Sequence, residues 1–98
     1  MKKPATRRKV NPTQVITELL TFQLGPLEAY VEWDEDAQCY ASWTDGDEFA
    51  SCGYTPEEAI AMLKEAIRGQ MAAARDHGLK PAELSPSQIR QLDRAVMA

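Results

Sequence analysis

Apolar residues recur along the chain with two different periods, and the change of period separates predicted helices from predicted strands. Three segments have the spacing of an amphipathic helix, at about 12–23, 56–77 and 86–97. The longest of the three carries an apolar stripe, which consists of Ile60, Leu63, Ile67, Met71 and Ala74. We therefore expect one long helix that packs on a hydrophobic surface, with a shorter helix before it and another after it.

The three predicted helices begin with the same kind of sequence. Asn11, Thr55 and Ser85 each precede a proline, and glutamate or glutamine stands at the third helical position. The cap side chain can accept a hydrogen bond from a free backbone N–H, and the third residue can bond back to the cap. Proline fits the first helical position because an N–H there would have no partner. The long helix should end near Gly78, which can take the left-handed conformation that closes a helix.

Between the first two predicted helices the period changes to two, which is typical of a strand with one buried face. Strands are predicted at about 27–33, 38–44 and 48–52, and a short fourth strand at about 80–84. An Asp45-Gly46 pair predicts a two-residue hairpin turn between the second strand and the third. The apolar positions of the first strand are Leu27, Ala29, Val31 and Trp33.

These elements together predict an α+β fold. An N-terminal helix precedes a three-stranded antiparallel meander, and the long helix packs across the meander because this arrangement covers both apolar surfaces. A chain of 98 residues is long enough for one modest core. We therefore expect a single domain over residues 11–98, preceded by a flexible basic arm at residues 1–10.

Charge is strongly segregated along the sequence. The segment from Val10 to Leu63 contains eleven acidic residues and no lysine, arginine or histidine. Two interpretations fit this segregation: the carboxylates keep the protein in solution, or they bind a basic partner. The candidate partner-binding residues are Tyr30, Glu32, Asp34, Asp36, Tyr40, Asp45, Asp47 and Glu48.

The two tryptophans, Trp33 and Trp43, follow the apolar alternation of their strands and are expected in the core. The opposite face of the sheet would then combine acidic and tyrosine side chains. Tyrosine provides contact area and a hydrogen bond at a small entropic cost, which suits a protein-binding surface. The uncharged residues expected on this face are Tyr30, Tyr40, Ser42 and Thr44.

Basic residues occur in two groups outside the acidic segment. The arm is a weak candidate for nucleic-acid binding through phosphates, although the acidic body would repel a duplex, so direct DNA binding is not expected without a partner. Lys64, Arg68 and Arg75 share one side of the long helix, where they either face solvent or contact the acidic residues of the same chain or of a second copy. The basic residues of the arm are Lys2, Lys3, Arg7, Arg8 and Lys9.

The sequence contains no motif for catalysis, for a cofactor or for a metal ion, and we expect no enzyme activity. The carboxylates fall mainly in two turns, where neighbouring side chains diverge, so they do not predict a metal site. His77 is expected at the end of the long helix, where the helix dipole favours a protonated imidazole. Cys39 and Cys52 are expected as reduced thiols on neighbouring strands, with a disulfide between them as the alternative.

Part of the chain, about residues 27–86, resembles the HicB antitoxin family. The resemblance is carried by residues 30–36, 40–43, 52–60 and 64–67, which read YVEWDED, YASW, CGYTPEEAI and KEAI. It implies a partially degenerate ribonuclease-H-like core and the neutralisation of a small, basic, mRNA-cleaving toxin of the HicA type. The chain departs from the family in the loop before the third strand. Its last residues also do not match the C-terminal DNA-binding module that many members carry.

The sequence therefore predicts a non-enzymatic acidic binding module that neutralises a basic nucleic-acid-binding protein, in the manner of a HicB-type antitoxin. No apolar run is long enough for a membrane span and no export signal follows the basic start, so we expect a cytoplasmic protein. A homodimer is also expected, because the meander leaves a strand edge unpaired. Two alternatives stay open: a phage-encoded inhibitor that mimics nucleic acid against a host defence complex, and a dimeric transcription regulator.

Overall fold

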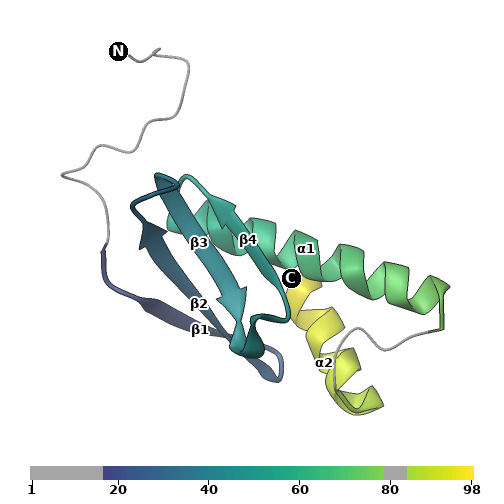
Figure 1. Cartoon of the computed structure of the whole chain (residues 1–98). Helices are drawn as coiled ribbons and strands as arrows, with labels where there is room; N and C mark the ends of the chain where they lie inside the picture. Colours follow the sequence, from purple (N-terminus) through teal and green to yellow (C-terminus); the bar gives the residue numbers. More distant parts are fainter. Residues whose placement is uncertain (1–16, 79–83) are drawn as a thin grey trace.

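The computed structural model describes residues 17–78 and 84–98, except for the side chain of Asp47. These residues form an α+β fold with a four-stranded antiparallel sheet and two helices, which confirms the predicted class (Figure 1). The strand order follows the chain order, so each strand pairs with the next. In sequence, the elements are β1 (Leu20–Leu24), β2 (Leu27–Asp34), β3 (Cys39–Thr44), β4 (Ala50–Gly53), α1 (Pro56–Asp76) and α2 (Pro86–Met97).

The N-terminal helix predicted over 12–23 is wrong where the structure describes it, because Leu20–Leu24 is strand β1. A two-residue Gly25-Pro26 loop joins β1 to β2, and the φ angle of Gly25 is +60°. Glycine takes this conformation without a steric penalty, and it allows a two-residue loop to bring two strands into register. Residues 1–16 lie outside the described residues, so the expected arm and the start of the predicted helix are untested.

The sheet therefore has one strand more than the predicted meander, and this additional strand is β1, which precedes the meander in the sequence. The short strand predicted at about 80–84 falls largely on residues 79–83, which lie outside the described residues. The first two strands of the predicted meander are confirmed as β2 and β3, and each lies within one residue of its expected bounds.

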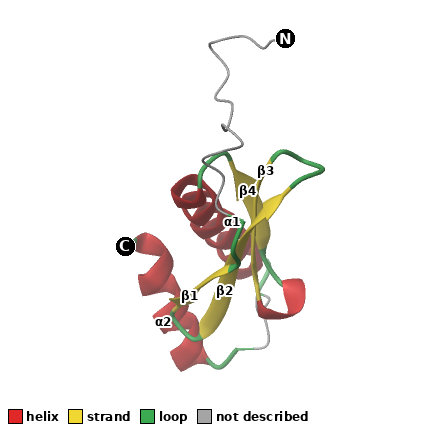
Figure 2. Ribbon diagram, turned by 90° about the vertical axis from the view of Figure 1, so that its left-hand side faces the viewer, coloured by secondary structure: helices red, strands yellow, loops and turns green. Residues whose placement is uncertain are grey.

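Both helices pack on the same face of the sheet, which we call the inner face (Figure 2). The predicted apolar stripe of α1 is confirmed at its centre, because Leu63, Ile67 and Met71 are fully buried between the sheet and α2. The contact between β4 and α1 is very close. A Cβ atom at Gly53 would lie 2.5 Å from the backbone nitrogen of Ala59, so no larger residue fits without moving the helix.

The predicted helix starts are confirmed at both described helices. The Oγ1 atom of Thr55 accepts a hydrogen bond from the backbone nitrogen of Glu58 at 3.0 Å, and a Glu58 carboxylate oxygen accepts from the nitrogen of Tyr54 at 2.7 Å. Ser85 and Gln88 form the reciprocal capping box at the start of α2. These bonds satisfy backbone groups that the first turn of a helix leaves free. The start predicted at Asn11 lies outside the described residues.

The two tryptophans are not on the same face of the sheet, in contrast to the prediction. Trp33 faces the helices and meets Tyr40 edge-on, with 5.1 Å between ring centroids. Trp43 pairs with Tyr30 across β2 and β3, so it lies on the opposite face. The inner positions of β3 are therefore polar or aromatic, and all are buried: Tyr40, Ser42 and Thr44.

The buried hydroxyl groups of β3 are satisfied, which explains why polar residues are tolerated there. The Oγ atom of Ser42 donates to the carbonyl oxygen of Ala59 in α1 at 2.9 Å. The Oγ1 atom of Thr44 accepts from the backbone nitrogen of Phe49 at 3.3 Å. A buried polar group with a partner avoids the desolvation penalty that an unpaired one would carry.

The loop between β3 and β4 is longer than the predicted two-residue turn. Asp45–Asp47 forms a short 3₁₀ turn in which only Gly46 has a positive φ angle, whereas the predicted turn type requires two such residues. The nitrogen of Thr44 donates to the carbonyl oxygen of Phe49 at 3.0 Å and closes the loop. The extra residues allow the side chain of Phe49 to enter the core, and β4 starts two residues later than predicted.

Candidate functional site

Neither helix covers the opposite face of the sheet, as Figures 1 and 2 show. We call it the outer face. Its position follows from the alternation of β2 and β3, in which residues paired across the strands project to the same side. The side chains at its centre are those of Glu28, Tyr30, Glu32 and Asp34 in β2 and of Ala41 and Trp43 in β3.

An aromatic pair lies at the centre of the outer face. The rings of Tyr30 and Trp43 are stacked, with 5.5 Å between centroids and 28° between ring planes. The Tyr30 hydroxyl donates a hydrogen bond to the Asp45 carboxylate. This bond, followed by desolvation and by the charges of Asp45 and Glu28, raises the pKa of Tyr30 to about 12. Tyr30 therefore remains neutral at physiological pH and connects the β3–β4 loop to the sheet.

Two carboxylates flank the aromatic pair along β2. Glu28 and Glu32 precede and follow Tyr30 by two residues, and both side chains are exposed. Neither forms an ion pair or a hydrogen bond with another residue in the described part of the chain. Their negative charges are thus available to solvent or to a partner.

The turn between β2 and β3 uses part of its acidity for its own structure. The Asp34 carboxylate accepts hydrogen bonds from the backbone nitrogens of Asp36 and Ala37, at 3.0 and 3.2 Å. The Glu35 carboxylate accepts from the indole nitrogen of Trp33 at 2.9 Å. Such local bonds from side chains to the backbone are a common way to build a tight turn. Asp34 and Glu35 therefore have a structural role, whereas the exposed carboxylate of Asp36 forms no hydrogen bond or ion pair with residues 17–78 or 84–98.

A shallow pocket of about 340 Å³ lies beside this turn and is lined mostly by carboxylates. Among residues 17–78 and 84–98, no group of three or more His, Cys, Asp or Glu side chains is arranged to hold a metal ion. The pocket is thus an acidic depression beside the β2–β3 turn. The lining residues are Glu32, Trp33, Asp34, Glu35, Asp36 and Ala41.

The predicted partner-binding residues do not all meet on one surface. Tyr30, Glu32 and Asp34 lie on the outer face and Asp45 contacts it through Tyr30, whereas Tyr40 is only 3% exposed and lies on the inner face. The expected position of Tyr40 on the acidic face is therefore wrong.

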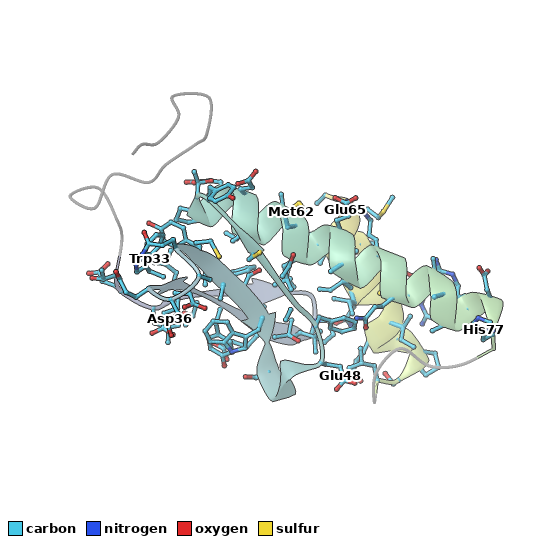
Figure 3. The ribbon with its side chains drawn as sticks, turned by 45° about the horizontal axis from the view of Figure 1, so that its top comes forward. Trp33, Asp36, Glu48, Met62, Glu65 and His77 are labelled. Carbon is cyan, nitrogen blue, oxygen red and sulfur yellow. The ribbon has the colours of Figure 1, made fainter. Side chains whose placement is uncertain are left out.

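The remaining predicted acidic residues lie at the two ends of the strands. Asp36 is in the β2–β3 turn and Glu48 is in the loop after β3, so the length of β3 separates them (Figure 3). The side chain of Asp47 lies outside what the structure describes. Lys2, Lys3, Arg7, Arg8 and Lys9 also lie outside the described residues. Trp43 and Glu28, which the sequence analysis did not select, complete the surface.

The described basic residues are all on the two helices, and two of them hold the helices together. A guanidinium nitrogen of Arg68 donates to the carbonyl oxygen of Val96 at the end of α2. A guanidinium nitrogen of Arg75 lies 3.7 Å from a carboxylate oxygen of Asp93. Within residues 17–78 and 84–98, the carboxylates of the outer face are not neutralised by basic side chains.

His77 lies far from the two cysteines, which are near the opposite end of α1. His77 follows the last turn of α1, at the end of the helix that points away from the acidic turn (Figure 3). Cys39 and Cys52 are free thiols on β3 and β4.

Neither described helix combines the length and the apolar character that a membrane-spanning helix needs. In the comparisons with known proteins, no family model, curated protein or solved structure matches the chain.

Proposed function

We propose that the protein is a non-enzymatic binding module whose outer face holds a basic partner protein. One observation carries the proposal: a sheet face left uncovered by both helices presents a stacked aromatic pair between carboxylates that have no described basic partner. Aromatic side chains provide contact area at a low entropic cost, and complementary charge accelerates association and selects partners. A purely solubilising surface does not require the two rings.

The resemblance to HicB antitoxins suggests the class of partner. A toxin that cleaves mRNA must present a basic surface to hold RNA. An acidic outer face would occupy that surface and compete with RNA for it. We therefore propose that the chain neutralises a small, basic, RNA-binding toxin by covering its RNA-binding surface.

The test is co-expression of the full chain with the small basic protein encoded beside its gene, with cell growth and co-purification as readouts. The proposal predicts that the wild-type chain rescues growth and co-purifies with the toxin. The variant Glu28→Gln/Glu32→Gln/Asp36→Asn, which removes three exposed charges from the outer face and its adjoining turn, should lose both effects.

A matched control removes the same number of charges from α1, which lies on the other side of the sheet. The variant Glu57→Gln/Glu65→Gln/Asp76→Asn changes three exposed carboxylates and should rescue growth as the wild type does. Equal losses in the two variants would mean that net charge alone matters and would contradict a binding face. Absence of both rescue and co-purification with the wild-type chain would overturn the antitoxin proposal, and recovery of a large nucleoprotein complex in its place would favour an inhibitor.

A further inference from the structure

Two cysteines lie next to each other at the edge of the sheet where β4 ends. Cys52 pairs with Ala41 in register, and Cys39 precedes Ala41 by two residues, so the two thiols are diagonal neighbours on the same side of the strands. Both line one pocket of about 400 Å³, together with Gly53, Tyr54 and Met62 among others. Both thiols are free in the structure.

The two thiols differ in access. Cys52 is exposed, whereas Cys39 is only 9% exposed. Burial raises the pKa of Cys39, and the neighbouring Cys52 thiol raises it further. An oxidant from solvent therefore reaches the exposed Cys52 thiol first, and the buried Cys39 is a second thiol in the same pocket.

Cys39 is the first residue of β3 and pairs with Asp34 of β2, but it has no partner in β4. The pairing between β3 and β4 ends at Tyr40 and Gly53, so Cys39 lies one residue beyond the last pair. A disulfide needs a short separation between the two Cα atoms, and diagonal neighbours within a ladder are usually slightly too far apart. The two thiols are nevertheless close enough for a hydrogen bond, which is one cause of the raised pKa of Cys39, so a bond between the sulfur atoms requires only a small further approach.

We propose that Cys39 and Cys52 form an oxidation site that hydrogen peroxide converts into a disulfide. In the first step the Cys52 thiolate attacks one peroxide oxygen; an S–O bond forms, the O–O bond breaks, and hydroxide leaves and becomes water. In the second step the Cys39 sulfur attacks the Cys52 sulfenic acid; the S–S bond forms, the S–O bond breaks, and the leaving hydroxide takes the Cys39 proton. Two thiols are thus oxidised by two electrons in total, and one peroxide is reduced to two waters.

The register places both cysteines on the same side of the strands as Ala41, a residue of the outer face, but their oxidation needs only the two thiols and a small uncharged oxidant, so it can be tested without the proposed partner. Peroxide carries no charge, so the acidic outer face does not repel it. The consequence for the fold is a covalent link between β3 and the edge strand β4.

The experiment treats the full-length protein with peroxide, blocks remaining thiols with iodoacetamide after denaturation, and identifies peptides by mass spectrometry. Trypsin is unsuitable because the acidic segment contains no cleavage site, but a glutamate-specific protease cuts after Glu35, Glu48 and Glu57. Cys39 and Cys52 then lie on separate peptides, 36–48 and 49–57. The proposal predicts one linked pair of peptides, lighter than the two reduced peptides by two hydrogen atoms, which separates after reduction with dithiothreitol.

Single substitutions provide the controls. Cys52→Ser and Cys39→Ser should each abolish the linked pair, and Cys52→Ser should leave the Cys39 thiol to be alkylated. Three results would overturn the proposal: alkylation of both cysteines in the treated wild type, conversion of Cys52 to a sulfinic or sulfonic acid beside an alkylated Cys39, or a disulfide between two Cys52 residues of separate chains.

Discussion

The two faces of the sheet are built from the same strands but differ in composition and in what covers them. The inner face combines apolar, aromatic and hydroxyl-bearing side chains that pack against the helices, and among the described residues its buried polar side-chain atoms all have hydrogen-bond partners. The outer face carries large aromatic and charged groups that neither helix covers. Residues of the inner face include Ala29, Val31, Ser42 and Thr44, and those of the outer face include Glu28, Tyr30, Glu32 and Trp43.

This difference indicates that the two faces contribute to different properties of the protein. Burial on the inner face supplies the free energy that holds the fold, because apolar area is removed from water there. The exposed carboxylates of Glu28 and Glu32 on the outer face add self-repulsion, and within the described residues they gain no hydrogen bond or ion pair on folding. A surface of that kind is retained when it serves solubility or a partner, and the stacked aromatic pair favours a partner.

The largest expected effect concerns the inner face. Leu63→Ala removes a fully buried side chain between the sheet and α2, and we expect it to lower the free energy of unfolding by about 3 kcal/mol. The exposed Glu32→Ala on the outer face should change it by less than about 0.5 kcal/mol. Urea denaturation followed by tryptophan fluorescence measures both, and similar losses would break the distinction between the two faces.

Close packing on the inner face gives the next largest effect. Gly53→Ala would place a Cβ atom 2.5 Å from the backbone of α1, so the helix must shift, and we expect a loss of about 2 kcal/mol. Gly69→Ala is the matched control, because Gly69 is inside α1 and no atom lies within 4 Å of its added Cβ. It should stabilise the protein by about 1 kcal/mol through helix propensity. Equal stability of Gly53→Ala and the wild type would refute the close contact.

Which residues of β2 and β3 share a face depends on whether the loop between the two strands has an even or an odd number of residues. Residues 35–38 form an even-numbered loop, so Trp33 pairs with Tyr40, and Tyr30 with Trp43. An odd-numbered loop would have placed both tryptophans on one face, as predicted. The apolar pattern could not decide this, because β3 carries apolar or aromatic residues in both phases. The hydrogen-bond partners of Ser42 and Thr44, which make their burial tolerable, come from α1 and the next loop.

The helix starts and the buried centre of α1 could be predicted because they depend on local spacing and capping. Strand β1 was missed because Leu19 and Leu20 also fit a helical stripe. The signal that identifies it is the Gly25-Pro26 pair, which joins two segments of alternating residues. Of the acidic candidates, Glu32 was placed correctly on the face that neither helix covers, whereas Asp34 was expected in the turn and is the last residue of β2. The face of Tyr40 depended on the register of β3.

A smaller effect concerns the hydrogen bond that connects the β3–β4 loop to the outer face. Asp45→Asn should lower the pKa of Tyr30 from about 12 toward 10, because it removes both the carboxylate acceptor and its charge. The raised pKa means that the folded state holds its proton more tightly than the unfolded state. Its contribution to stability is therefore present below pH 10 and is lost as the pH rises through about 12.

Ultraviolet absorbance of tyrosinate measures this titration. The difference between the wild type and Tyr30→Phe isolates the signal of Tyr30, and the same difference recorded in the Asp45→Asn background gives the shift. An unchanged midpoint in that background would show that Asp45 does not hold the Tyr30 hydroxyl.

The most direct test of the outer face is NMR titration of the labelled full-length protein with decalysine at low salt. If negative potential is concentrated on the outer face, the indole signal of Trp43 and the backbone amides of β2 will shift in a saturable manner, and Glu28→Gln/Glu32→Gln/Asp36→Asn will abolish the shifts. Added salt should weaken them, because it screens exposed charges. Shifts of equal size along the exposed acidic side of α1, at Glu57, Glu65 and Asp76, would contradict the account.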